Sequence, residues 1–168
     1  MAERAGRWGA FAVAAGVFAL DRLSKWVVET RMTGWETYTV IPGCFNLIRT
    51  ENRGAAFSLL AGLEGPWPAL LLILLTAAAV VVISALLWRF GVSAESGPAL
   101  RYGLALILGG ALGNLFDRLF RGAVTDFLEL YAGEFRWPAF NLADAAITAG
   151  ALLALWDMWR ARRARHGS

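Results

Sequence analysis

The sequence predicts an all-α integral membrane protein with four transmembrane helices and a small β-structure outside the spans. Hydrophobic residues make up 58% of the 168 residues, against about 45–50% in soluble domains. Charged residues make up 17%, against about 25%, and the mean hydropathy is +0.52. A small domain cannot hide so much apolar surface from water. We therefore expect a single membrane domain over residues 1–168, and not a soluble, disordered or disulfide-stapled chain.

The first predicted span covers residues 8–28. It is apolar as far as Leu20 and then contains Asp21, Arg22 and Lys25. A cleaved signal peptide is the alternative interpretation of this segment. We favour a membrane span because the apolar stretch resumes after these charges, with no clear small-residue cleavage site.

Residues 35–60 have the pattern of β-structure. Residues 37–41 and 45–50 are rich in β-branched and aromatic side chains, and Pro42-Gly43 separates them. Short runs of this kind, broken by turn residues, predict a small hairpin or sheet.

Three further spans are predicted at about 66–88, 99–119 and 138–159. The second contains no charged residue, and crossing the hydrocarbon core takes about 20 apolar residues. The third and fourth carry polar residues near one end. We expect the fourth helix to begin at Pro138 and to be followed by a basic tail at 160–168.

Basic residues predict the orientation of the four spans. Both termini lie on one side, and the short segments there carry eight arginines: Arg4, Arg7, Arg89, Arg101, Arg160, Arg162, Arg163 and Arg165. The other side carries its arginines over longer segments that also contain glutamates. This bias predicts that both termini are cytoplasmic. The net charge of +3 then reflects orientation and contact with anionic membrane lipids, and we expect no nucleic-acid partner.

Cysteine and histidine counts limit the chemistry. Cys44 is the single cysteine and His166 the single histidine, three residues from the C-terminal end of a basic tail. A lone cysteine forms no intramolecular disulfide, and a nucleophilic serine or cysteine would have no plausible histidine base. A zinc site is equally disfavoured. We therefore expect no metal and no organic cofactor.

Asp21 and Lys25 form the first polar pair at membrane depth. Their i,i+4 spacing puts them on one face of the first helix. One structural interpretation is that Lys25 extends to the outer interface while pairing with Asp21.

The third span contains a second polar group beside a run of small residues. Gly109 and Gly113 form a Gly-x-x-x-Gly pattern, which predicts close packing against another helix. The i,i+4 spacing of Asn114 and Arg118 aims an amide and a guanidinium at one place, where the arginine requires a carboxylate partner. The alternative is that Asp117 and Arg118 anchor the helix end at the interface.

Asp126 and Asp144 are the candidate catalytic pair. Asp144 follows Pro138 by six residues, which predicts a position about 9 Å into the fourth helix, with Asn141 on the same face. The short connection lets both aspartates reach one depth near the outer leaflet. Two carboxyls in a low-dielectric site share a proton, so one can activate water while the other protonates a carbonyl. Spacing alone leaves open two unrelated interfacial aspartates.

Five sequence blocks follow one another from the first span to the fourth. They are Asp21-Arg-Leu-Ser-Lys25, Asn52-Arg-Gly-Ala-Ala-Phe57, Gly109-Gly-Ala-Leu-Gly-Asn-Leu-Phe-Asp-Arg118, Val124-Thr-Asp-Phe127 and Phe140-Asn-Leu-Ala-Asp144. Together they closely resemble the bacterial lipoprotein signal peptidases, the type II signal peptidases. Arg22 and Ser24 depart from the glutamine and threonine that are frequent in that family.

The resemblance implies a four-helix intramembrane aspartic peptidase with an extracytoplasmic β-cradle, located in the bacterial cytoplasmic (inner) membrane. Its reaction would be removal of the signal peptide from diacylglyceryl-modified prolipoproteins, N-terminal to the lipidated cysteine. Asp126 and Asp144 match the catalytic aspartates of the family. The resemblance assigns supporting roles to eight further residues: Asp21, Lys25, Asn52, Gly54, Asn114, Arg118, Asn141 and Ala143.

We expect a monomer whose partners are lipid-modified prolipoproteins and membrane lipids, with the active site near the extracytoplasmic face. Two other classes of protein compete with this interpretation. A small transporter or channel would use the same polar residues to line a pathway, but these residues cluster toward one side of the membrane. A packing or assembly protein would leave the two carboxyls and the Asn114–Arg118 pair unexplained.

Overall fold

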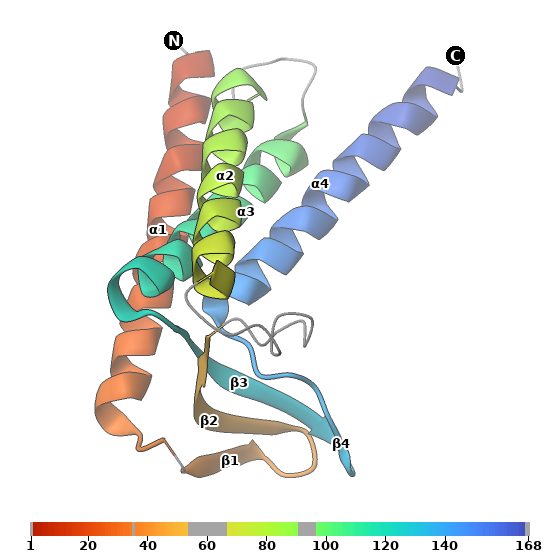
Figure 1. Ribbon diagram of the computed structural model, residues 1–168. Helices are drawn as coiled ribbons and strands as arrows, with labels where there is room; N and C mark the ends of the chain where they lie inside the picture. The colour runs from red at the N-terminus through yellow and green to blue at the C-terminus, as the bar shows by residue number, and fades with distance from the viewer. Residues whose placement is uncertain (1, 35, 54–66, 91–96, 167–168) are drawn as a thin grey trace.

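The computed structural model describes residues 2–34, 36–53, 67–90 and 97–166. A bundle of four helices stands on an antiparallel sheet, and both chain termini lie at the end of the bundle away from that sheet (Figure 1). The helices are α1 (Ala2–Arg31), α2 (Trp67–Phe90), α3 (Pro98–Arg121) and α4 (Leu142–His166). Gly54 and the rest of the expected β-segment up to residue 60 fall outside the described residues.

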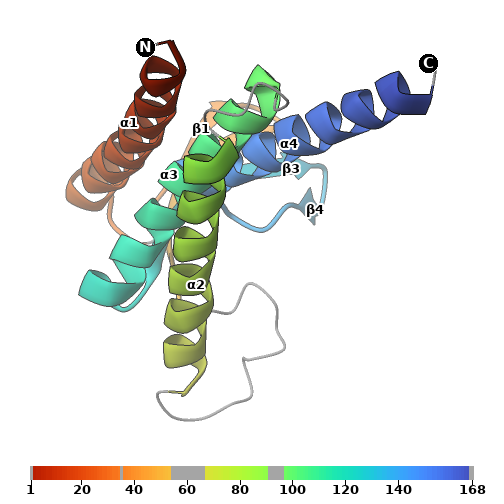
Figure 2. The same cartoon turned by 90° about the horizontal axis from the view of Figure 1, so that it is seen from above.

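Helix α3 is the centre of the bundle and contacts the other three helices, whereas α4 diverges from α1 and α2 toward its C-terminal end (Figure 2). Glycines allow these contacts. A Cβ at Gly109 would lie 2.5 Å from the carbonyl oxygen of Ala14 on α1, and one at Gly103 would lie 2.6 Å from that of Gly150 on α4. The prediction that the small-residue run packs against another helix is confirmed.

Three of the four helices are long and apolar enough to cross a membrane, judged by length and composition over the described residues: α2, α3 and α4. Helix α1 also has the required length, with 30 residues, but it carries several charges. Asp21 and Lys25 on this helix are fully buried. Helix α1 therefore presents these charges to the protein interior.

The ends of α4 differ from the prediction. Phe140 forms an antiparallel β-bridge with Leu128 of β3, which keeps the chain extended beyond Pro138. The helix therefore begins at Leu142, and it continues through the expected tail to His166. Asp144 consequently lies in the first turn of α4, and the predicted depth of about 9 Å is wrong.

The sheet has the order β1-β2-β3-β4 with antiparallel neighbours. Its strands are β1 (Thr37–Ile41), β2 (Phe45–Asn52), β3 (Val124–Ala132) and β4 (Phe135–Arg136). The first two strands agree with the prediction, whereas β3 was not predicted. An irregularity in β2 between Leu47 and Thr50 sets the register in which Thr50 lies opposite Asp126 and Asn52 lies opposite Val124.

An apolar cluster fixes β3 to the end of α1. Phe127 on β3 packs with Val28 on α1 and with Met32, which directly follows that helix, and all three side chains are buried. Arg49 on β2 adds a polar contact, because its guanidinium donates to the backbone carbonyls of Glu29 and Met32 at 3.0 and 2.9 Å. Asp126 is thereby held at the junction between sheet and bundle.

Candidate active site

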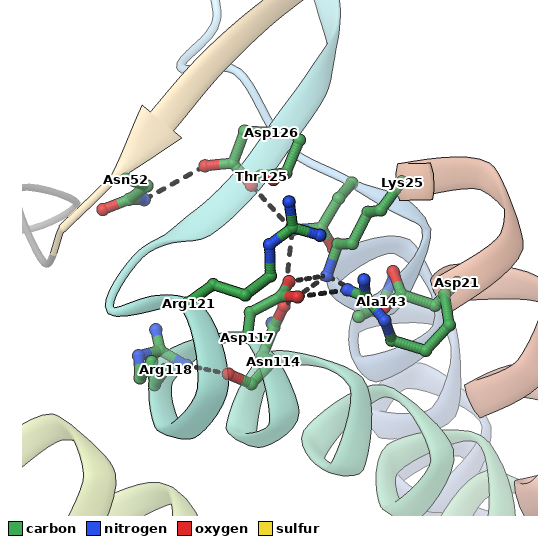
Figure 3. A network of polar contacts seen from close by, with 12 residues as sticks. Asp21, Lys25, Asn52, Asn114, Asp117, Arg118, Arg121, Thr125, Asp126 and Ala143 are labelled. Carbon is green, nitrogen blue, oxygen red and sulfur yellow. Dashed lines mark hydrogen bonds and ion pairs between the residues drawn. The ribbon is translucent and has the colours of Figure 1, made fainter. Parts of the chain in front are cut away.

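The Asp126 carboxyl on β3 is held by two amide donors. Asn52 Nδ2 donates to its Oδ2 at 3.1 Å (Figure 3). Asn141 Nδ2 donates to its Oδ1 at 2.6 Å. The residue is only 2% exposed. Burial raises the pKa of Asp126 to about 6, and the negative charge of Asp144 adds to this effect while the bond from Asn52 opposes it. Asp126 can therefore exchange a proton near neutral pH.

The Asp144 carboxyl lies at the N-terminus of α4. Asn114 Nδ2 donates to Asp144 Oδ1 at 2.7 Å, and the backbone N–H of Asn141 donates to Oδ2 at 3.3 Å. In return, the backbone N–H of Asp144 donates to Asn141 Oδ1 at 2.9 Å. This reciprocal pattern is a capping box, and the helix dipole favours a carboxylate at that end. Asp144 and Asn141 therefore start the helix together.

Two asparagines link the two carboxyls. Asn141 donates through its side chain to Asp126 and through its backbone to Asp144. Its side chain also donates to Asn114 Oδ1 at 3.4 Å, and Asn114 in turn holds Asp144. Neutral amides, not cations, thus fix both carboxyls in one network.

Lys25 is the centre of an adjacent charged cluster. Its Nζ lies 2.8 Å from Asp21 Oδ2 and 2.7 Å from Asp117 Oδ2, and it donates to Asn114 Oδ1 at 3.1 Å (Figure 3). The contact with Asn114 has the geometry of a hydrogen bond, and the two contacts with the carboxylates are ion pairs. The predicted pairing of Asp21 with Lys25 is confirmed, but the interpretation that Lys25 extends to the interface is wrong, because the side chain is fully buried against α3.

Asp21 connects this cluster to α4. Its Oδ1 accepts from the backbone N–H of Ala143 at 3.0 Å, one residue before Asp144. Gly113 makes room for this contact, because a Cβ there would collide with the Asp21 carboxylate. The Gly-x-x-x-Gly pattern therefore serves both helix packing and the placement of a buried charge.

Arg118 does not converge with the Asn114 side chain as predicted. Its Nη1 donates to the backbone carbonyl of Asn114 at 3.3 Å, while the Asn114 amide points the other way, into the network (Figure 3). Asp126 and Asp144 attract the guanidinium electrostatically, but within the described part of the chain neither makes a direct ion pair with it. Asp117 is fully buried and pairs with Lys25 and Arg22, so an interfacial Asp117–Arg118 anchor is wrong.

Glu29 is a polar residue beside the site that the sequence analysis missed. Its carboxylate pairs with Arg121 on α3 and accepts from Thr125 Oγ1 on β3 at 2.6 Å. Its side chain is only 7% exposed. These partners are more than 90 residues away along the chain, so no local spacing could have revealed them. Glu29 secures the residue next to Asp126.

Each carboxyl faces a cavity of its own. A cavity of about 540 Å³ reaches Asp144 and is lined by apolar residues of α4 such as Ala149 and Leu152. A second cavity, of about 320 Å³, reaches Asp126 and Asn52. Residues 138–139 line both cavities. Over the described ranges, no group of three or more metal-ligating side chains converges.

Two carboxyls joined by amides, at the base of a bundle of apolar helices, are the arrangement expected of an aspartic peptidase of the membrane. A family model described as Signal peptidase (SPase) II matches residues 13–160. The chain belongs to this signal peptidase II family, whose aspartic peptidases cleave the signal peptides of prolipoproteins.

Curated relatives and a solved structure agree with this assignment. A lipoprotein signal peptidase of Solibacter usitatus is 48% identical over 94% of each chain. One from Azoarcus sp. (strain BH72) is 47% identical over 89% of this chain and 81% of that protein. A solved bacterial membrane enzyme is 26% identical and superposes with a TM-score of 0.74 over 90% of this chain and 88% of its own. The predicted family, reaction and four-helix fold are confirmed for this multi-pass membrane protein of bacteria.

Proposed function

We propose that Asp126 and Asp144 are the catalytic pair and that the enzyme cleaves N-terminal to a diacylglyceryl-modified cysteine. The observation that carries this proposal is the bridge of Asn141 and Asn114 between two carboxyls that form no direct ion pair with any of the described residues. A pair of this kind shares a proton near neutral pH, because both groups cannot ionise easily in a low-dielectric site.

The shared proton gives the two carboxyls complementary roles. The ionised carboxyl takes a proton from a water molecule as that water attacks the scissile carbonyl, while the protonated carboxyl donates to the carbonyl oxygen. The tetrahedral species then collapses as a proton passes to the leaving amine. No covalent intermediate with the enzyme forms.

The supporting residues act through hydrogen bonds to this pair. Asn52 and Asn141 hold Asp126, while Asn114 holds Asp144. Lys25 and Asp21 fix Asn114 and the Ala143 backbone in turn. Arg118 supplies positive charge beside the pair and is placed to orient a substrate carbonyl or a lipid phosphate. Gly54, which lies outside the described residues, keeps the supporting role that the sequence block Asn52–Phe57 assigns to it.

The orientation and the substrate route form a second part of the proposal. Both termini are cytoplasmic, the sheet and the carboxyl pair lie near the extracytoplasmic face, and the enzyme acts as a monomer. A prolipoprotein arrives laterally through the lipid, since its signal segment and its acyl chains are apolar. The apolar cavity along α4 that ends at Asp144 suits such a substrate.

The catalytic roles are tested by cleavage of a lipid-modified prolipoprotein peptide in detergent micelles. Asp126→Asn and Asp144→Asn should each abolish turnover while thermal unfolding shows a folded protein. Asp157→Asn is the matched control, because it makes the same change at the opposite end of α4. If either active-site variant cleaves the substrate at the rate of the unmodified enzyme, the catalytic assignment of that aspartate is wrong.

The orientation is tested with the single cysteine of the chain. Cys44 is exposed in the turn between β1 and β2, so a membrane-impermeant maleimide should label it in intact spheroplasts. In a Cys44→Ser background, Ala161→Cys near the end of α4 should react only after the membrane is permeabilised. The reverse pattern of labelling would show that the orientation is inverted.

A further inference from the structure

We infer that Arg22 is a positioning residue for the carboxyl pair: by neutralising the buried charge cluster between α1 and α3, it sets the pH range in which Asp126 and Asp144 work. The inference rests on the proposed catalytic role of this pair. It concerns a position at which the chain departs from the glutamine frequent in the family it resembles.

The cluster contains a second cation, Arg22. Asp21, Lys25 and Asp117 are fully buried, with both carboxylates within 2.8 Å of the one ammonium group. A single lysine neutralises only one of the two carboxylates, and an uncompensated buried charge is costly. Arg22 pairs with Asp117 and brings the total to two cations and two anions.

Arg22 is held in this position from two sides. Its guanidinium carbon lies 4.8 Å from the ring centroid of Phe116 on α3 while the group pairs with Asp117. The side chain is only 17% exposed. A cation over an aromatic face and against a carboxylate is fixed in orientation, so Arg22 acts as a component of the cluster and not as a mobile surface arginine.

The cluster is coupled to both carboxyls of the pair. Lys25 donates to Asn114, which donates to Asp144. Burial dominates the raised pKa of Asp126, and the positive charge of Lys25 is one of the influences that lower it again. The field of the cluster therefore reaches the second carboxyl as well, through a medium that screens charge much less than water does.

The other charged groups around the site are balanced without Arg22. Three ion pairs flank the sheet and the ends of α1 and α3: Glu29 with Arg121, Glu51 with Arg53, and Glu129 with Arg136. Arg49 donates to backbone carbonyls at the end of α1. Arg118 on α3 contributes positive charge directly beside Asp126 and Asp144. Among the described residues, only Lys25 and Arg22 form ion pairs with Asp117, so none of these other groups takes the place of Arg22 there.

The sign of the effect follows from the charge count. Arg22→Gln leaves the cluster with a net negative charge, which disfavours ionisation of the catalytic pair and moves its working range to higher pH. Asp117→Asn leaves a net positive charge and moves the range to lower pH. The double variant retains the neutral Asp21–Lys25 pair, so its range returns to that of the unmodified enzyme.

The experiment measures kcat/KM against pH for cleavage of a lipid-modified prolipoprotein peptide in micelles. R22Q should move both limbs of the profile upward and D117N should move both downward, each by up to about one pH unit, the size expected for one unit charge that acts across a medium of intermediate dielectric. R22Q/D117N should return to within about a quarter of a unit of the unmodified enzyme. Arg22→Lys, which keeps the charge, should leave the profile in place.

The opposite signs separate this role from an ordinary stabilising salt bridge, whose loss would lower stability in both single variants without moving their profiles in opposite directions. An unmoved profile in R22Q, or single variants that move the same way, would overturn the inference. If R22Q does not fold, the pH profile of D117N is compared with those of R22K and the double variant. A downward shift in D117N alone supports the inference, and an unmoved profile in D117N overturns it.

D126N separates a failure of this inference from a failure of the proposed function. If D126N cleaves the substrate, Asp126 and Asp144 are not the catalytic pair and the proposed function fails. If D126N is inactive and the pH profile of R22Q is unchanged, the role of Arg22 is overturned, whereas the assignment of Asp126 and Asp144 stands.

Discussion

Two polar clusters lie side by side in this molecule, and they handle buried charge in opposite ways. In the cluster of Asp21, Arg22, Lys25 and Asp117, every charge has a partner of opposite sign. In the pair of Asp126 and Asp144, the partners are neutral amides of asparagine. Pairing of every buried charge makes this cluster a structural support. Amide donors hold a carboxyl in place and leave its proton free to move, which is what acid–base chemistry requires.

The largest expected effect comes from breaking the compensated cluster at its centre. Lys25→Met leaves Asp21 and Asp117 buried with Arg22 as their one remaining cation, and removal of one partner from a buried charge network costs about 3–5 kcal/mol. Unfolding in detergent, followed by heat or denaturant, measures this loss. Glu51→Gln, which removes the exposed ion pair with Arg53, is the control and should change stability by less than about 1 kcal/mol. Equal losses in the two variants would contradict the contrast between the clusters.

The next prediction concerns how the titration of Asp126 makes the stability of the folded protein depend on pH. The pKa of Asp126 is raised to about 6 in the folded protein, so the native state binds a proton more tightly than the unfolded chain does. Below about pH 4 both states are protonated and the group contributes nothing to the pH dependence. As the pH rises through 6, the native state must bury a carboxylate, which destabilises it by about 2–3 kcal/mol.

Asp126→Asn removes this titration. The stability of D126N relative to the unmodified enzyme should therefore increase by about 2–3 kcal/mol between pH 4 and pH 7. Denaturant titrations at a series of pH values measure the difference. A difference that stays constant over this range would show that Asp126 does not titrate as described.

A smaller effect is expected from weakening the amide bridge while keeping the helix start. Asn141→Ser retains a capping hydroxyl for α4 but loses the donor to Asp126. A hydrogen bond to a charged group contributes about 1.5–3 kcal/mol, so kcat/KM should fall by about 10–100-fold with little loss of stability. Asn141→Ala should lose both activity and about 1 kcal/mol of stability. If N141S kept the activity of the unmodified enzyme, the bridge would have no role in catalysis.

The smallest effect is expected outside both clusters. Glu29→Gln removes the charge that pairs with the half-exposed Arg121 but keeps an acceptor for Thr125. Stability should fall by about 1 kcal/mol or less, and kcat/KM should fall only a few-fold. Thr125→Val, which keeps the shape and removes the hydroxyl, separates the hydrogen bond from the ion pair. A loss comparable to that of K25M would mean that Glu29 belongs to the essential network.

Local signals were enough to predict part of this structure. Continuous apolar runs located α2 and α3 to within two residues, and β-branched pairs around Pro42-Gly43 located β1 and β2. Strand β3 escaped prediction because residues 124–127 are all buried, so the run shows no alternation of polar and apolar residues. Pro138 suggested too early a start for α4, because the bridge from Phe140 to Leu128 is a tertiary contact that the local sequence does not encode.

The site was predictable in its members but not in its contacts. The sequence blocks identified the two aspartates and the three asparagines, and spacing identified the Asp21–Lys25 pair. The burial of Lys25 depends on Asp117, and the position of Asp126 depends on Asn52 and Asn141, which all come from distant elements. Spacing along one helix therefore misplaced both Lys25 and Arg118.

The two cavities that meet at residues 138–139 have a consequence for how the reactants reach one another. Hydrolysis inside a membrane joins a substrate that dissolves in oil to one that dissolves in water. The cavity at Asp144 is walled by alanine, leucine and aromatic side chains, whereas the cavity at Asp126 is walled in part by Thr50, Glu51 and Asn52. Residues 138–139 line both cavities, so we expect the peptide to approach from the apolar side of these residues, water from the polar side, and the scissile bond to lie next to them.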